Sequence, residues 1–147
     1  MKRPSLHIAM PCYDSVKIRT MISIVRLVKE LTAAGLKFDI NTMQSPYVAY
    51  ARNILMSRFL QRDEDYLLFI DADLEFDPEC VLKMLIADKD IICTPYRVKT
   101  NDPESVQYTV SIKNPHNVKI LTGGLVEVQN GPAGMMMVKR NVFEKLI

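Results

Sequence analysis

Two aspartates that follow one apolar run are the residues of this sequence best placed to do chemistry. The run is Tyr66-Leu67-Leu68-Phe69-Ile70, and Asp71 and Asp73 come directly after it. Such a run is typical of a strand buried in a parallel sheet, and ligands of these sheets bind outside the carboxyl ends of the strands. Two carboxylates there suit Mn²⁺ or Mg²⁺, ions that usually also hold substrate phosphates. We therefore expect Asp71 and Asp73 to bind a metal ion.

The same spacing of two aspartates occurs twice more, so spacing alone does not identify the site. Asp63 and Asp65 lie in a charged turn, and Asp88 and Asp90 precede the apolar run Ile91-Ile92-Cys93. Only the pair at 71 and 73 follows a predicted strand. The alternative for that pair is that its carboxylates are solvated acids at a strand end, without a ligand.

A calcium-binding loop is a further interpretation, because acidic residues recur between positions 71 and 79. An EF-hand needs glycine at its sixth position and glutamate at its twelfth. Phe76 and Leu82 stand there, which excludes this loop. Asp77 and Pro78 instead predict the capped first turn of a helix.

The composition indicates a single domain with a sizeable core. The chain has 147 residues, of which 48% are hydrophobic and 24% charged, and its net charge of +2 does not favour a nucleic-acid partner. The cysteines Cys12, Cys80 and Cys93 form neither a disulfide framework nor a zinc pattern, which favours a reducing compartment. Because no apolar stretch reaches about 18 residues, we expect no membrane span and a cytoplasmic protein.

Strands and helices alternate in the first part of the sequence, up to Pro95. Strands are predicted at residues 6–10, where Pro11 ends the first one, and at 36–40, 66–70 and 90–94; helices are predicted before Gly35, at 46–60 and at 78–87. The predicted buried faces of the first two helices are Met21, Ile24, Val25, Val28 and Leu31, and Tyr47, Ala51, Ile54, Leu55 and Phe59. His7 is expected to be a strand residue with an ordinary hydrogen bond. The alternation predicts an α/β fold with a mainly parallel, Rossmann-like sheet and helices on both faces.

The second part of the sequence has a different pattern, which predicts a short mixed or antiparallel region. Residues 97–105 form a predicted mobile loop, and the alternation over 106–112 predicts a half-exposed strand. Further short strands are predicted at 118–121, 125–128 and 135–138, and a helix from about Asn141.

Five runs, in this order, resemble the nucleotide-sugar glycosyltransferases of GT-A fold, in particular the compact GT2-like enzymes of large DNA viruses. The runs are Ile8–Asp14, Ala51-Arg52-Asn53, Leu68–Asp73, Asp88–Ile92 with Pro95-Tyr96, and Gly131–Arg140. Together they cover most of the chain. The resemblance implies one GT-A domain over residues 1–147, with a nucleotide-binding half at 1–96 and an acceptor-side half at 97–147.

The resemblance also implies the function. The chain would be a hexosyl- or pentosyltransferase that moves a sugar from a nucleoside-diphosphate sugar of UDP or GDP type to a glycan or glycoprotein acceptor. The enzyme would use Mn²⁺ or Mg²⁺ and, if the protein is viral, would act in the host cytoplasm. A divalent ion serves such a reaction because it offsets the negative charge that develops on the leaving diphosphate.

In the resembling family, the end of the first strand and the D-x-D motif hold the nucleotide sugar. These positions correspond here to Pro11, Cys12, Tyr13 and Asp14, and to Asp71, Ala72 and Asp73, with Asp73 as the more direct metal ligand. Arg52 is expected beside the nucleotide, since a guanidinium suits a phosphate. A structural salt bridge from Arg52 to a neighbouring acid is the alternative.

The resemblance assigns the donor sugar and the acceptor to other segments. Tyr96 and Arg97 correspond to a loop beside the donor sugar, and Gly131 and Gly134 to the acceptor-side edge. Ordinary hairpin turns are the alternative for these glycines.

A general base is not identified in the sequence. Members of the resembling family normally continue beyond a segment such as Lys139-Arg140, whereas this sequence ends at Ile147. We therefore expect weak turnover at most, and a non-catalytic domain that binds nucleotide or metal remains the alternative. A receiver-like signalling domain is a more distant alternative, for which Asp14 is a poor substitute for the required acids.

Overall fold

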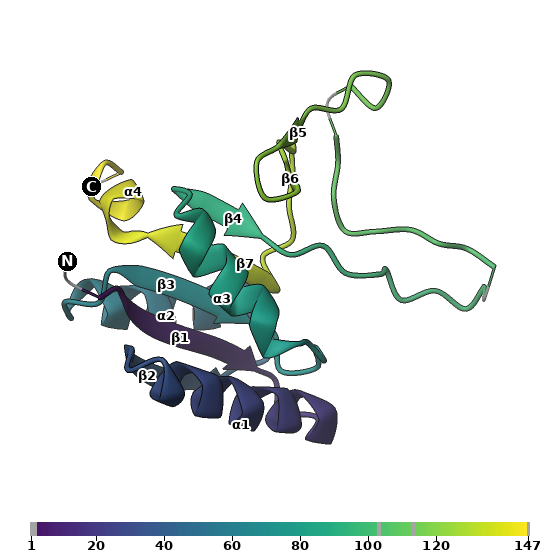
Figure 1. Ribbon diagram of the computed structural model, residues 1–147. Helices are drawn as coiled ribbons and strands as arrows, with labels where there is room; N and C mark the ends of the chain where they lie inside the picture. Colours follow the sequence, from purple (N-terminus) through teal and green to yellow (C-terminus); the bar gives the residue numbers. More distant parts are fainter. Residues whose placement is uncertain (1–2, 103, 113, 147) are drawn as a thin grey trace.

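A sheet of five strands forms the centre of the fold in the computed structural model, which describes residues 3–102, 104–112 and 114–146. The order of the strands is β2-β1-β3-β7-β4 (Figure 1). Their bounds are Ser5–Cys12 for β1, Lys37–Gln44 for β2, Tyr66–Ile70 for β3, Ile91–Cys93 for β4 and Met135–Lys139 for β7. β1 pairs in parallel with β2 and β3, whereas β7 is antiparallel to both of its neighbours. The sheet is therefore mixed: β1 to β4 run in one direction, and β7, from the part predicted to be mixed or antiparallel, runs in the other.

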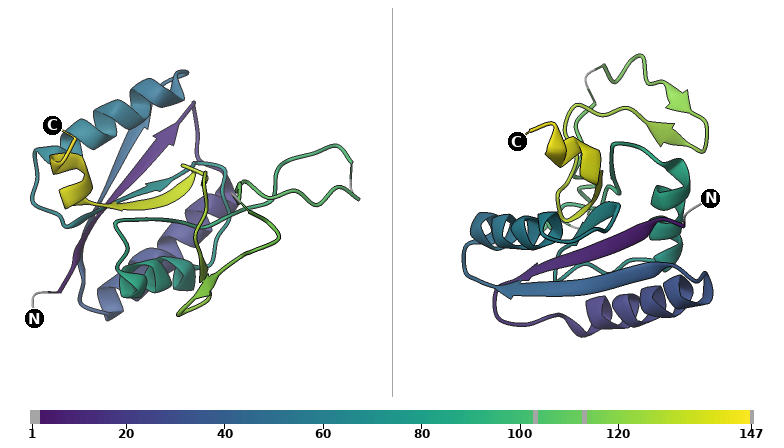
Figure 2. Two further views of the ribbon diagram at one scale, coloured as in Figure 1. Left: turned by 90° about the horizontal axis from the view of Figure 1, so that it is seen from above. Right: turned by 90° about the vertical axis from the view of Figure 1, so that its left-hand side faces the viewer.

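Helices cover both faces of this sheet, as predicted (Figure 2). On one face lie α1 (Ile18–Ala33) and α3 (Pro78–Ala87), and on the other lie α2 (Val48–Leu60) and the short α4 (Arg140–Glu144). The strand β3 is fully buried because its alternate side chains pack into these two layers. This placement explains why the run Tyr66–Ile70 is apolar at every position, and the predicted bounds of β3 and α3 are confirmed.

The burial of two helices differs from the prediction. In α1, Met21 and Val25 are exposed, while the small polar residues Thr20 and Ser23 are buried. The hydroxyl of Ser23 accepts a hydrogen bond from the backbone N–H of Phe76, at 3.1 Å, which ties this face of α1 to the loop before α3. Tyr47, predicted to be buried beside α2, lies before that helix and is also exposed.

Pro11 does not end the first strand, contrary to the prediction. β1 continues to Cys12, and its pairing with β2 continues with it. β3 pairs with β1 only over Leu6–Ala9, so Pro11 lies beyond the part of β1 that has a partner on both sides. A missing N–H is tolerated at such a position.

The predicted strand at residues 106–112 is wrong, because only two isolated bridges form there, between Arg97 and Tyr108 and between Ser111 and Asn130. Val106 and Tyr108 are 63% and 57% exposed, so the first half of this segment has no core to face, whereas Val110 and Ile112 are half-buried. The strands predicted at 118–121 and 125–128 shorten to β5 (Ile120–Leu121) and β6 (Leu125–Val126), which form a separate hairpin. Gly123 and Gly124 have positive φ angles in its turn, a conformation that glycine adopts readily.

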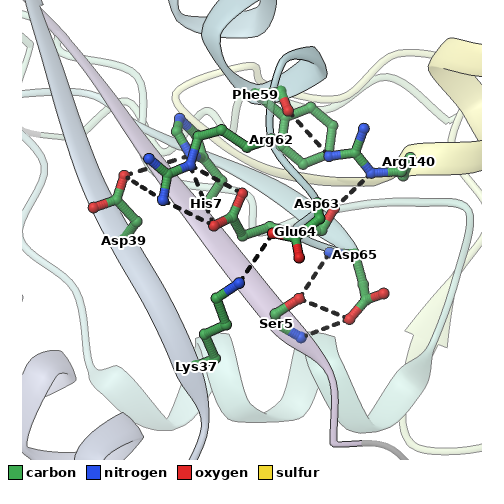
Figure 3. Close-up of polar contacts among 10 residues, drawn as sticks. All are labelled: Ser5, His7, Lys37, Asp39, Phe59, Arg62, Asp63, Glu64, Asp65 and Arg140. Carbon is green, nitrogen blue, oxygen red and sulfur yellow. Dashed lines mark hydrogen bonds and ion pairs between the residues drawn. The ribbon is translucent and has the colours of Figure 1, made fainter.

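Charged side chains gather around two buried titratable groups, His7 and Glu64, near the amino-terminal ends of β1, β2 and β3 (Figure 3). Glu64 is fully buried and accepts hydrogen bonds of 3.0–3.2 Å from the guanidinium of Arg62. His7 is also fully buried, and neither ring nitrogen has a hydrogen-bond partner, which corrects the expected ordinary hydrogen bond. The pKa of His7 is lowered by burial, although the carboxylates of Glu64 and Asp39 oppose the shift.

Within the residues that the structure describes, no helix is long and apolar enough to cross a membrane, in agreement with the sequence prediction.

Candidate functional site

The predicted residues from the first strand and from the D-x-D motif meet at one edge of the sheet, where β1 and β3 end and α1 begins (Figure 1). The segments are tied together by their backbones: the N–H of Lys17 donates to the carbonyl of Ala72 at 2.9 Å, and the N–H of Asp71 donates to the carbonyl of Gly134 at 2.8 Å. Parallel strands bring their carboxyl ends to the same edge, which is why residues far apart in the sequence converge there.

An open pocket of about 300 Å³ lies at this edge. Predicted residues line much of it: Pro11, Cys12, Tyr13, Asp14, Asp71, Ala72 and Asp73. Sequence reasoning missed the other lining residues, which are Ser15, Lys17, Ser45, Pro46 and Val48. The second group comes from the connections after β1 and β2 and from the first residue of α2, Val48. The predicted parallel arrangement of the strands was the signal that could have found them. The volume falls at the small end of the range for ligand pockets.

Arg52 reaches from α2 to the first aspartate of the pair. Its Nη2 donates to Oδ1 of Asp71 at 2.8 Å, and the two side chains are 25% and 31% exposed. The guanidinium also lies 6.0 Å from the ring centre of Phe69, while its buried Nε has no hydrogen-bond partner. The salt bridge that the sequence left as an alternative is thus present, and it fixes the orientation of Asp71. Contact between Arg52 and a nucleotide stays a prediction.

The second aspartate of the pair faces a cation from a distant loop. Lys99 forms an ion pair with Asp73, and the hydrogen bond from its ammonium group to this carboxylate raises the pKa of Lys99. The side chain of Lys99 is mostly exposed and that of Asp73 about half exposed, so this pair is one that a competing cation can replace. No pattern in the sequence connects Lys99 with Asp73, because the loop that carries it has no regular structure.

Tyr96 and Gly134 also pack against Asp71. A Cβ atom at Gly134 would clash with the Tyr96 hydroxyl and with the Asp71 carboxylate, so the absence of a side chain at Gly134 lets these two groups approach. Burial raises the pKa of Tyr96, and the negative charge of Asp71 adds to the shift. Tyr96 is therefore a neutral hydroxyl at the edge of the acid pair.

Two other predicted residues, Arg97 and Gly131, contact parts of the fold outside the pocket. Arg97 donates from Nη2 to the backbone carbonyl of Ser105 at 2.9 Å, within its own loop. Gly131 lies against Cys93 at the end of β4, where a Cβ atom would clash with the Cys93 sulfur. Neither residue lines the pocket beside Asp71.

The donor atoms at this edge fit a divalent ion only in part. Among the described residues, no group of three or more histidine, cysteine, aspartate or glutamate side chains could hold a metal ion. Asp71 and Asp73 offer carboxylate oxygens, which suit Mn²⁺ or Mg²⁺, and Asp73 already faces the positive charge of Lys99. The arrangement matches an ion held by one or two carboxylates, with water and substrate phosphate completing its shell.

Replacing Arg52 by lysine should weaken nucleotide binding in the presence of Mn²⁺ by roughly tenfold and leave the fold intact. Lysine keeps the charge but loses the planar fork that orients Asp71. Titration calorimetry and thermal unfolding of the variant measure the two effects. Arg58→Lys, on the same helix, is the matched control, because Arg58 donates to the Thr42 carbonyl away from the acid pair. Equal losses of stability and no selective loss of binding would show that Arg52 has a structural role only.

Replacing Gly134 by alanine should lower the affinity for Mn²⁺ by roughly 10–100-fold, the range seen when groups that orient a ligand are changed. The new Cβ pushes aside the ends of two side chains, Asp71 and Tyr96, so the fold is expected to survive while Asp71 moves. Gly131→Ala is the matched control, since its Cβ would press on Cys93 instead. Electron paramagnetic resonance of free Mn²⁺ measures both affinities, and equal affinities would contradict this role of Gly134.

Comparison with known proteins shows similarity at the level of structure. No protein-family model matches the chain, and no curated protein has a significant match to it. Among the matching solved structures is the crystal structure of A197 from STIV, with a TM-score of 0.59 and 25% sequence identity. The match covers 97% of this chain and 68% of the A197 chain. This chain is therefore similar to A197 over almost its whole length, with a shared α/β architecture.

Proposed function

We propose that this chain is a metal-dependent glycosyltransferase of GT-A type that binds a nucleoside-diphosphate sugar in the pocket at the carboxyl ends of β1 and β3. One observation carries the proposal: the end of β1 and the pair Asp71 and Asp73, which resemble two motifs of that family, line the same pocket. If the two aspartates were only solvated acids at a strand end, there would be no reason for the end of β1 to line the same pocket.

The residues of the pocket divide between binding and orientation in this proposal. Tyr13 and Asp14, at the open end of β1, contact the nucleoside, and the carboxylates of Asp71 and Asp73 hold Mn²⁺ or Mg²⁺. Arg52 fixes Asp71 through the 2.8 Å ion pair, and Lys99 yields its position at Asp73. The ion, when bound, would offset negative charge on the leaving diphosphate. The sugar is passed to a glycan or glycoprotein acceptor.

A domain that binds the donor without transferring its sugar is the second candidate. The observation that favours it concerns the carboxylates: Asp71 and Asp73 are both paired with cations, and Asp14 is the other carboxylate that lines the pocket in the described part of the chain. A general base typically contributes about 10²–10⁴-fold in rate. The second candidate therefore binds the donor with the same metal dependence and leaves it intact.

Thermal unfolding with nucleoside diphosphates and their sugar conjugates, with and without Mn²⁺, tests the binding that both candidates share. A ligand at a hundredfold excess over its Kd stabilises the fold by about 2.7 kcal/mol, which corresponds to a rise in the unfolding midpoint of roughly 5–10 °C. We expect this rise only when nucleotide and metal are both present. Inorganic pyrophosphate with Mn²⁺ is the control for binding that does not depend on the nucleoside. If no nucleotide raises the midpoint, both candidates are wrong.

Release of free sugar from the bound donor then separates the two candidates. A transferase should hydrolyse the donor slowly in the absence of acceptor, and the Asp73→Asn variant should not. An intact donor after prolonged incubation with the wild-type protein supports the binding domain.

A further inference from the structure

Helix α1 buries a mixed face, with Thr20 and Ser23 beside Leu27 and Leu31, and exposes a row of apolar residues to solvent. The hydroxyl residues Thr20 and Ser23 are 0% and 3% exposed, and the hydroxyl of Thr20 has no hydrogen-bond partner. Four large apolar residues form what we call the outer stripe: Ile18, Met21, Ile22 and Val25, with exposed fractions of 73%, 53%, 43% and 62%. The exposed row departs from the pattern expected for a helix at the surface of a domain, whose outward side is usually polar.

The outer stripe is a continuous surface. Its residues are spaced at i, i+3, i+4 and i+7, so they lie above one another on one side of the helix. The core takes its contacts from elsewhere on α1, since Leu27 and Leu31 are fully buried against the sheet. Single exposed apolar residues need no explanation, but a contiguous row indicates a surface that meets a partner.

Positive charge accompanies the outer stripe along the helix. Lys17 precedes it, Lys29 lies in line with it one turn beyond Val25, and Arg26 lies along its side. Nη1 of Arg19 forms an ion pair with Oε2 of Glu75 at 3.2 Å. The other three cations therefore supply most of the attraction for an anion.

Acidic residues near the stripe offset this charge only in part. Glu30 is the one acidic residue on α1. Arg26, Lys29 and Glu30 line a groove between α1 and α3 that also contains Asp77 and Glu79. Glu79 pairs with Lys83 at 3.1 Å, whereas Asp77 accepts from the uncharged N–H of Glu79 and keeps its negative charge.

We propose that the outer stripe docks on the surface of an anionic lipid bilayer, with α1 lying in the plane of the headgroups. An apolar row with cations beside it is the pattern of interfacial helices, whose apolar residues enter the membrane boundary while the cations meet lipid phosphates. α1 also lies at an outer flank of the molecule, where a flat partner could reach it (Figures 1 and 2).

A second copy of this chain fits the outer stripe less well. Two antiparallel copies of α1 that met at Met21 and Ile22 would bring Lys17 of each chain to the same level along the helix as Arg26 of the other. Like charges that face each other across an interface oppose association. The same two side chains favour binding to an anionic membrane, where both meet negative headgroups.

Sedimentation with lipid vesicles tests the proposal on the complete chain. We expect the protein to sediment with vesicles of equal parts phosphatidylcholine and phosphatidylserine at low salt, and at least about fivefold less with phosphatidylcholine alone or at high salt. The double variant Ile22→Ser/Val25→Ser should lose most of this binding and keep its unfolding midpoint, because both side chains are exposed.

Two further variants make the result specific. Arg26→Gln/Lys29→Gln should reduce binding to the anionic vesicles and leave the fold unchanged. Ile86→Ser is the matched apolar control, since Ile86 is 83% exposed on α3, and it should sediment like the wild type. Sedimentation of the wild type with neither vesicle, or equally with both, overturns the proposal. A dimer in light scattering that Ile22→Ser/Val25→Ser dissociates would assign the stripe to a second copy instead.

Discussion

Replacement of Glu64 by alanine should lower the free energy of unfolding by about 3 kcal/mol. Glu64 is fully buried, and Arg62 donates to both of its carboxylate oxygens. Its removal leaves a cavity and deprives Arg62 of these charge-assisted hydrogen bonds (Figure 3). For a chain of this size, the unfolding midpoint should fall by roughly 6–12 °C. Thermal and denaturant unfolding of the two proteins measure the difference.

Asp63→Ala is the matched control for this prediction. Asp63 neighbours Glu64 in sequence and pairs with Lys37 at 2.9 Å, but both side chains of that pair are mostly exposed. An exposed pair contributes about 0–1 kcal/mol, so the control should remain close to the wild type. Equal effects of the two substitutions would mean that the buried carboxylate has no special part in stability.

The same cluster sets the direction of the pH dependence. Burial alone would raise the pKa of Glu64, but the hydrogen bonds from Arg62, a backbone hydrogen bond and the positive charge of Arg62 together lower the pKa. The contribution of Glu64 is therefore present above its unfolded pKa of about 4.3 and is lost as the pH falls through the folded value. The lowered pKa of His7 likewise reduces stability as the pH falls below about 6.5. Stability should thus decline toward acid in two stages, and Glu64→Ala should lack the second.

The sequence predicts the elements that have strong local signals. β3 and α3 appear with the predicted bounds, and Asp77 caps α3 by accepting from the N–H of Glu79 at 2.9 Å. The antiparallel insertion of β7 between β3 and β4 was not predictable in this way, since the pairing of strands distant in sequence leaves no local pattern. The exposure of Met21 and Val25 on α1 was not predicted, because the spacing of these apolar residues is the same whether they face a core or solvent.

The candidate site follows the same division between local and distant contacts. Pro11 to Asp14 and Asp71 to Asp73 come from strand ends, which a predicted parallel pairing places together. The contact of Lys99 with Asp73 and that of Gly134 with Asp71 depend on how loops return across the edge of the sheet. The sequence could not decide whether Arg52 contacts a phosphate or a carboxylate. The answer depended on the position of Asp71, which the whole fold sets.

Replacement of Asp73 by asparagine should abolish the effect of Mn²⁺ on nucleotide affinity. In the wild-type protein, the metal joins the two carboxylates to the phosphates of the nucleotide, so each ligand should strengthen binding of the other. Asparagine keeps the shape of the side chain but removes the charge that a metal ion requires. Folding should change little, because Asp73 is about half exposed and its partner Lys99 is mostly exposed.

Two substitutions elsewhere are the controls for this prediction. Asp63→Asn and Asp90→Asn alter the other two pairs of aspartates with the same spacing, and neither residue lines the pocket. Both variants should keep the full metal effect. Loss of the metal effect in either variant would show that the spacing of two aspartates matters even away from the end of a strand.

Titration of the wild-type protein and the Asp73→Asn variant with a nucleoside diphosphate, with and without Mn²⁺, tests the central claim most directly. The proposed site predicts that Mn²⁺ tightens binding by at least about tenfold in the wild type and leaves the affinity of the variant at the metal-free value. Retention of the full metal effect by the Asp73→Asn variant, or its absence from the wild-type protein, would contradict a metal–nucleotide site at Asp71 and Asp73.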